Sequence, residues 1–221
     1  MTVGILGGTG DIGEGLALRL GHDTDRRVIV GSRSADRASE RAETYRSQLD
    51  KRGRSATIEG LSNAEAAAAA SIVVAAVPPY YLRETIDSVA AGLDEETVLV
   101  TPAVGMSGDE AGMHYDRPGA GSVTELAAST APDATPVVGA AHTLPAGRLA
   151  DLDADLGIDT VLVGPEPAKS RVRDLFEGID GLRTVDAGPL ANAAEIEAVT
   201  PLLINVAEYT DDLEALGVRF R

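Results

Sequence analysis

The sequence predicts an α/β fold, a doubly wound parallel sheet with a smaller C-terminal part. Short apolar runs typical of buried parallel strands alternate with longer helical patterns along most of the chain. The first run, residues 3–6, leads into Gly8, Gly10 and Gly13 with G-x-G-x-x-G spacing, and a helical pattern follows at residues 15–20. A glycine turn that joins a strand to a helix in this way is the opening unit of a Rossmann-type sheet.

The later elements follow from the same alternation. Strands are expected at the apolar runs 28–33, 56–58, 72–77, 97–100, 136–141, 160–164 and 182–186. Helices are expected at residues 34–50, 63–70, 83–93, 124–129 and 165–178, with two more opened by residues 188–189 and 200–201. In the last helix, Thr200 is the expected N-cap and Pro201 the expected first helical residue. The one plausible internal boundary lies at Thr143, which separates residues 1–143 from residues 144–221.

Each glycine of the first turn has a physical role in binding a dinucleotide. Gly8 allows the tight turn off the strand, Gly10 has no Cβ to block a pyrophosphate, and Gly13 lets the helix pack close to the sheet. Free N–H groups at the helix start then face the phosphates, where the helix dipole favours negative charge. The motif predicts a dinucleotide site, with a merely structural glycine turn as the alternative.

The residues after the second strand indicate which dinucleotide is bound. An NAD enzyme places Asp or Glu there to hold the ribose 2′-hydroxyl, but this chain has Ser32 and Arg33, with Arg37 one helical turn further on. Guanidinium and hydroxyl groups suit a 2′-phosphate, which a carboxylate would repel. The sequence therefore predicts NADP(H), with Thr9, Ser32, Arg33 and Arg37 at its phosphate end. The alternative is that both arginines are solvated surface charges.

Composition limits the partners that the protein can have. The 221 residues carry a formal net charge of −16, from 19 Lys+Arg against 35 Asp+Glu. Such a chain repels nucleic acid and anionic membranes, so neither is an expected partner. No apolar run approaches the roughly 18 residues that span a bilayer, and no signal peptide is expected, which favours a cytoplasmic protein. The acidic, lysine-poor composition suggests the hypothesis of a halophilic protein, adapted to a high-salt cytoplasm.

Further site residues are expected where strands end, because ligands of open α/β sheets bind beyond the carboxyl ends of the strands. The turn at Val77 and Pro78 is expected at the nicotinamide end, or else is only a rigid strand exit. The glycine-rich residues 103–122 are expected to form a flap near the cleft. His142 follows the sixth strand and is either a hydrogen-bonded structural residue or a cofactor contact. It has no partner at useful spacing for a triad or a metal site.

The chain resembles the archaeal NADPH-dependent coenzyme F420 reductases in several segments. These are residues 7–13 (GGTGDIG) with 15–19, 31–33 (GSR), 142–146 (HTLPA), 181–183 with 186–190, and 200–205 with 216–220. The resemblance implies a Rossmann domain and a smaller C-terminal part with the deazaflavin F420 between them. It also implies a homodimer, and reversible hydride transfer between C4 of the nicotinamide and C5 of the deazaflavin.

The resemblance also implies roles for single residues. NADP(H) would contact Thr9, Gly10, Asp11, Ile12, Ser32, Arg33 and Arg37, whereas Val77, Leu144, Ala146 and Leu216 would lie at the nicotinamide and deazaflavin rings. With the residues argued above, the expected cofactor-binding set is Gly8, Thr9, Gly10, Asp11, Ile12, Gly13, Ser32, Arg33, Arg37, Val77, Pro78, His142, Leu144, Ala146 and Leu216.

Hydride transfer between two carriers needs no protein nucleophile and no metal, because the cofactors supply the chemistry and the protein positions two flat rings. No catalytic side chain is therefore expected, and a chain without cysteine offers no thiolate. Two other functions stay open: an NADP-dependent reductase of a small imine or carbonyl substrate, and a non-catalytic NADP-binding redox module. The first usually needs a long helical domain, for which little chain remains after Gly188. The second is weakened by the lack of a transmembrane or partner segment.

Overall fold

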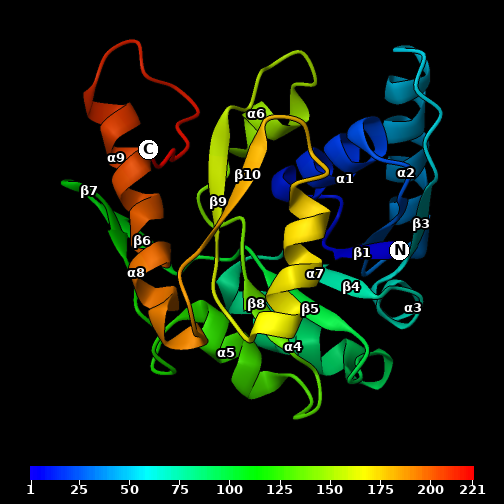
Figure 1. The fold of residues 1–221 in the computed structure, drawn as a ribbon, viewed down its shortest axis with the longest axis horizontal. Helices are drawn as coiled ribbons and strands as arrows, with labels where there is room; N and C mark the ends of the chain where they lie inside the picture. The colour runs from blue at the N-terminus through cyan, green and yellow to red at the C-terminus, as the bar shows by residue number, and fades with distance from the viewer.

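A six-stranded parallel sheet forms the centre of the computed structural model, which describes residues 1–221 (Figure 1). Its order is β3-β2-β1-β4-β5-β8. The strands are β1 (Thr2–Leu6), β2 (Arg27–Ser32), β3 (Ile58–Ser62), β4 (Ile72–Ala75), β5 (Val98–Thr101) and β8 (Val137–Gly139). The order reverses beside β1, so a crevice is expected at the carboxyl ends of β1 and β4. The predicted fold class is confirmed.

Helices cover both faces of this sheet. They are α1 (Asp11–Asp23), α2 (Ala35–Asp50), α3 (Asn63–Ala68), α4 (Pro79–Val89), α5 (Val123–Thr130) and α7 (Glu166–Phe176). One core cluster joins Val3 and Ile5 to residues of α1, α2 and α7, whereas a second joins Leu6 to residues of α3, α4 and α5. Because successive strand residues point to opposite faces, a sheet covered on both sides needs the continuous apolar runs seen in the sequence.

The C-terminal part adds a two-stranded sheet and further helices. Strands β9 (Ile158–Leu162) and β10 (Leu182–Asp186) pair in parallel, and an antiparallel bridge from Gly139 to Val163 attaches them to β8. A second bridge joins Asp159 to Val218, so the last residues pair with β9. Helices α6 (Ala146–Ala150), α8 (Ala193–Glu197) and α9 (Val199–Tyr209) complete this part. In Figure 1, α8 and α9 stand at one side of the molecule, next to β6 and β7.

Residues 103–122 differ most from expectation. The segment expected as a flap contains regular structure, an antiparallel hairpin of β6 (Met106–Asp109) and β7 (Gly112–Tyr115). The side chain of Asn205 on α9 binds this hairpin twice: Met113 N donates to its Oδ1 at 2.7 Å, and its Nδ2 donates to Met113 O at 2.8 Å. An amide that mimics a neighbouring strand in this way supplies the partner that a two-stranded ribbon lacks.

Several predicted boundaries were wrong for local reasons. β3 begins at Ile58 and not near residue 56, because its pairing with β2 runs from Ile58 to Ser62 along a half-exposed edge. α4 already begins at Pro79, which stands in the first turn, where a missing N–H leaves no hydrogen bond unmade. Thr200 is not an N-cap, because α9 begins at Val199 and follows α8 almost without a break. Its hydroxyl instead donates to the carbonyl of His142 at 2.9 Å.

No helix of the structure is long and apolar enough to cross a bilayer.

Candidate functional site

The glycine turn after β1 is a tightly packed loop. Gly7, not Gly8, has the positive φ of +71° that makes the turn, and a Cβ on Gly8 would lie 2.8 Å from the carbonyl oxygen of Ile5. A Cβ on Gly13 would lie 2.5 Å from Cα of Gly8, so α1 can pack against the loop only through a glycine there. The structure thus confirms that close packing of α1 requires a glycine at position 13. The tight turn is made at Gly7, one residue before the predicted Gly8.

Gly10 differs from its neighbours because the fold leaves space around it. A Cβ there would meet only the carbonyl oxygen of Gly7, at an ordinary 3.4 Å. Gly10 is also the N-cap of α1 and has no side chain to satisfy the first N–H groups of the helix. Both features fit the close approach of an anionic group such as a pyrophosphate. The hydroxyl of Tyr45, a buried residue of α2, donates to Gly8 O at 3.1 Å and braces the loop.

The end of β2 presents two free guanidinium groups. Ser32 is buried and its Oγ accepts from the N–H of Ser34 at 3.3 Å, while Arg33 and Arg37 are exposed. No ion pair involves either arginine, and the Arg33 guanidinium carbon lies 5.5 Å from the ring centre of Tyr81. Unpaired cations at this edge fit a doubly charged phosphate better than a hydroxyl.

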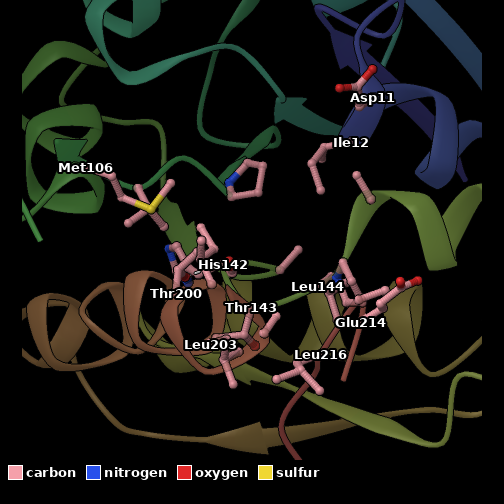
Figure 2. Close-up of a pocket in the computed structure, with 18 of the residues that line it drawn as sticks. Asp11, Ile12, Met106, His142, Thr143, Leu144, Thr200, Leu203, Glu214 and Leu216 are labelled. Carbon is pink, nitrogen blue, oxygen red and sulfur yellow. Dashed lines mark hydrogen bonds between the residues drawn. The ribbon is translucent and has the colours of Figure 1, made fainter. Parts of the chain in front are cut away.

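A cavity of about 770 Å³ opens between the glycine loop and the C-terminal part (Figure 2). Of the residues expected at the cofactors, it brings together Asp11, Ile12, His142, Leu144, Ala146 and Leu216. The others do not line this cavity: Gly8, Thr9, Gly10, Gly13, Ser32, Arg33, Arg37, Val77 and Pro78. For all but the last two, this arrangement fits a dinucleotide whose phosphate end extends away from the cavity.

Sequence reasoning missed most of the cavity wall. The residues after β5 contribute Pro102 and Val104, and β6 contributes Met106. α9 contributes Thr200, Leu203, Ile204, Ala207 and Glu208. The remaining residues missed are Ala141, Thr143, Pro145, Leu213, Glu214 and Ala215. The available signal was α9 itself, an apolar helix in which only Pro201 is buried. The turn after β5 lines the cavity, whereas Val77 and Pro78 after β4 do not. Their position at the nicotinamide end stays a prediction.

A buried hydrogen-bond network stands behind the cavity at His142. The carboxylate of Glu197, fully buried at the end of α8, accepts from the backbone N–H groups of Val123 and Thr124, each at 2.9 Å. It also accepts from the hydroxyls of Thr124 and Tyr115, each again at 2.9 Å. Thr124 Oγ1 in turn lies 3.2 Å from His142 Nε2. Glu197 was not predicted; its only signal was an acid in an apolar stretch.

Burial controls the protonation of this network. It lowers the pKa of His142 to about 4, so the imidazole is uncharged at neutral pH. Burial and the neighbouring Glu197 carboxylate raise the pKa of Tyr115 above its usual range, so its hydroxyl remains a donor. No cluster of three or more His, Cys, Asp or Glu side chains suits a metal ion. The cavity therefore offers an apolar, uncharged wall at His142, suited to a flat ring system.

Known proteins match this chain along nearly its whole length. A family model described as "NADP oxidoreductase coenzyme F420-dependent" matches residues 2–105. The F420-dependent NADP reductase of Methanocaldococcus jannaschii is 37% identical over 209 residues, which cover 93% of this chain and 92% of that protein. The F420-dependent NADP reductase of Methanothermobacter marburgensis is 34% identical over 210 residues, with the same coverage of both chains.

Solved structures share the fold. A putative F420-dependent NADP reductase from Arthrobacter sp. FB24 is similar over 100% of this chain and 99% of its own, with a TM-score of 0.80 at 21% identity. Glycerol-3-phosphate dehydrogenase from Coxiella burnetii is similar over 84% of this chain and 53% of its own, with a TM-score of 0.60 at 19% identity. These two likenesses concern the fold alone, whereas the sequence relatives decide the family. With the glycine loop, the free arginines and the apolar cavity in place, the chain belongs to the F420-dependent NADP reductase family.

Proposed function

We propose that this protein transfers hydride reversibly between NADP(H), bound along the glycine loop and the end of β2, and coenzyme F420, bound in the adjoining cavity. This is the activity for which its sequence relatives are named. One observation carries the assignment of the two sites: the apolar cavity begins at Asp11 and Ile12, at the start of α1. A dinucleotide with its pyrophosphate on the glycine loop would extend its nicotinamide from there into the cavity.

On the dinucleotide side, the protein binds NADP(H) and orients it. The open space at Gly10 accepts the pyrophosphate, and the free N–H groups at the start of α1 bind its oxygens. Thr9, Ser32, Arg33 and Arg37 hold the 2′-phosphate, with each guanidinium free to form charge-assisted hydrogen bonds. None of these groups reacts. Their role is to fix the dinucleotide so that its nicotinamide reaches the cavity.

On the deazaflavin side, the protein encloses the rings of F420 and excludes water from them. A cavity of about 770 Å³ lies within the usual range of roughly 300–1,000 Å³ for small-molecule sites, and most of the lining is apolar. Leu144, Ala146 and Leu216 pack against the rings, and residues 144–221 complete the wall. When bound, the two cofactors supply the hydride donor and acceptor. Holding their rings in contact contributes up to about 7–11 kcal/mol of the barrier reduction.

The protein surface also bears on the oligomeric state and on the salt concentration to which the protein is adapted. Exposed Leu202 and Tyr209, two turns apart on one face of α9, form an apolar surface suited to a second copy of the chain, in support of a homodimer. The net charge of −16 supports a cytoplasmic enzyme adapted to high salt. Its melting temperature should then rise in molar salt, which screens the self-repulsion. A melting temperature that stays constant would contradict the salt adaptation.

The decisive assay mixes the protein with NADPH and oxidised F420 and follows the visible absorbance of the deazaflavin. We expect that absorbance to fall with NADPH and to fall far more slowly with NADH. Gly13→Val, which blocks the packing of α1 on the glycine loop, is the inactive control. Unchanged absorbance with folded protein that binds NADPH would refute the proposal. Oxidation of NADPH by a cyclic imine in place of F420 would favour an imine reductase.

A further inference from the structure

Three threonine hydroxyls hold the chain around His142. Thr160 Oγ1 on β9 accepts from the N–H of Ala141 at 2.8 Å, and Thr200 Oγ1 on α9 donates to His142 O at 2.9 Å. The third, Thr124 Oγ1 on α5, lies 3.2 Å from His142 Nε2. Ala141 has a φ of +65°, a conformation that a residue with a Cβ adopts only when its surroundings impose it. Elements distant in sequence thus converge to place one imidazole.

The direction of the hydrogen bonds follows from Glu197. Its two oxygens already accept from two backbone N–H groups and from the Tyr115 hydroxyl, and a carboxylate has no proton to give. Thr124 must therefore donate its only hydroxyl proton to Glu197 Oε1, 2.9 Å away. Its oxygen can then only accept from the histidine, so His142 Nε2 must carry the proton.

The other ring nitrogen agrees with this assignment. His142 Nδ1 is buried and has no hydrogen-bond partner. An unpaired lone pair in that position costs less free energy than an unpaired N–H donor. Both nitrogens therefore favour the same tautomer, and burial leaves the ring uncharged.

We propose that Glu197 and Thr124 are positioning residues that hold His142 in the Nε2–H tautomer at the cavity wall. They act through the histidine and do not line the cavity beside it. The consequence for the reaction rests on the function proposed above. His142 presents a neutral ring in one fixed orientation to the bound cofactors. Loss of the Thr124 hydroxyl frees that ring to rotate and lowers kcat/KM for F420.

The first test needs no cofactor. The chain has only three histidines, His22, His114 and His142, so nitrogen-15 NMR of the imidazoles can be assigned with a single His142→Asn variant. Ligand-free wild-type protein should show a protonated Nε2 and a bare Nδ1 for His142 at neutral pH. Thr124→Val keeps the shape but removes the hydroxyl, and should produce the other tautomer or a mixture. Thr124→Ser should restore the wild-type pattern.

Tyr115→Phe is the matched control. It removes one hydrogen bond to the same carboxylate, on the side away from His142, and so destabilises the network without interrupting it. The Tyr115→Phe variant should keep the wild-type nitrogen pattern. A protonated Nδ1 in the wild type, or an unchanged pattern in Thr124→Val, would overturn the proposal, as would an altered pattern in Tyr115→Phe.

Kinetics supply the second readout. In Thr124→Val, kcat/KM for F420 should fall about tenfold, the usual effect of one buried hydrogen bond, while the KM for NADPH stays unchanged. Thr124→Ser should recover that loss. If wild-type protein does not reduce F420, the proposed function fails while the tautomer assignment stands. An altered tautomer with unchanged kcat/KM for F420 would instead remove the role of the histidine in the reaction.

Discussion

The two halves of the site are held in opposite ways. At the end of β2, Arg33 and Arg37 are exposed and without ion pairs, so their charges contribute little to the folded state. Behind the cavity, Glu197 and His142 are buried and satisfied almost entirely by protein groups. The guanidinium groups of the first half are available to a ligand, whereas the polar groups of the second half hydrogen-bond to each other and fix the cavity wall. Substitutions should therefore affect affinity at the first and stability at the second.

The largest effect on stability is expected from Glu197→Ala. It leaves two buried backbone N–H groups and two hydroxyls without their acceptor. The free energy of unfolding should fall by about 3–5 kcal/mol, as for other broken buried networks. Urea denaturation measures it. A loss below about 1 kcal/mol would remove the contrast between the two halves.

The pH dependence of stability should report His142. Its pKa is about 4 in the folded state, against an ordinary value of about 6.5 when unfolded, so the unfolded chain takes up the proton first as the pH falls. Stability should therefore be lost between about pH 6.5 and 4, by up to about 3 kcal/mol. His142→Gln, compared with wild type by urea unfolding across this range, should lack that part of the slope. Parallel slopes for the two proteins would contradict the buried, uncharged imidazole.

Two glycine substitutions distinguish residues of the first half that serve packing from those that serve cofactor binding. Gly13→Ala places a Cβ against the backbone of Gly8 and should cost about 1–3 kcal/mol of stability. Gly10→Ala meets open space and should leave stability unchanged within about 0.5 kcal/mol, yet weaken NADP(H) and NAD(H) alike. Thermal unfolding and cofactor titration separate the two effects. Equal stability losses would mean that Gly10 serves the fold and not a ligand.

The smallest effect on stability is expected from Arg33→Asp. The free energy of unfolding should change by less than about 0.5 kcal/mol, because the side chain is exposed and forms no ion pair. Affinity for NADP(H) should fall about 10- to 100-fold, as expected for a lost charge-assisted hydrogen bond, and by less for NAD(H). Titration with 2′,5′-ADP and 5′-AMP isolates the phosphate. Equal losses for both nucleotides would show that Arg33 does not bind the 2′-phosphate.

The sequence predicts the first half of the site far better than the second. The glycine loop and the residues after β2 are local signals, because the spacing of a few neighbouring residues already determines the strand, turn and helix. The parallel, doubly wound sheet follows from the alternation of these units. Even so, the positive φ belongs to Gly7 and not Gly8, since G-x-G-x-x-G spacing does not reveal which peptide turns.

The cavity wall could not be predicted in the same way, because its residues meet only after the chain has folded. Leu144, Ala146 and Leu216 came from a family resemblance, but Met106 and Leu203 had no local pattern that marked them. The Glu197 network joins α5, α8 and β7 across many intervening residues. Its acid and hydroxyls resemble ordinary surface groups in the sequence, and only their burial in the structure distinguishes them.

Residues 213–216 close the cavity, although they follow every strand of the central sheet in the chain. During synthesis on the ribosome, the glycine loop and β2 therefore emerge long before the wall that faces them. A nascent chain can fold its glycine loop early, but it has no closed cavity until residues 213–216 leave the exit tunnel. The order of translation thus delays any chemistry that needs the cavity until those residues have been made.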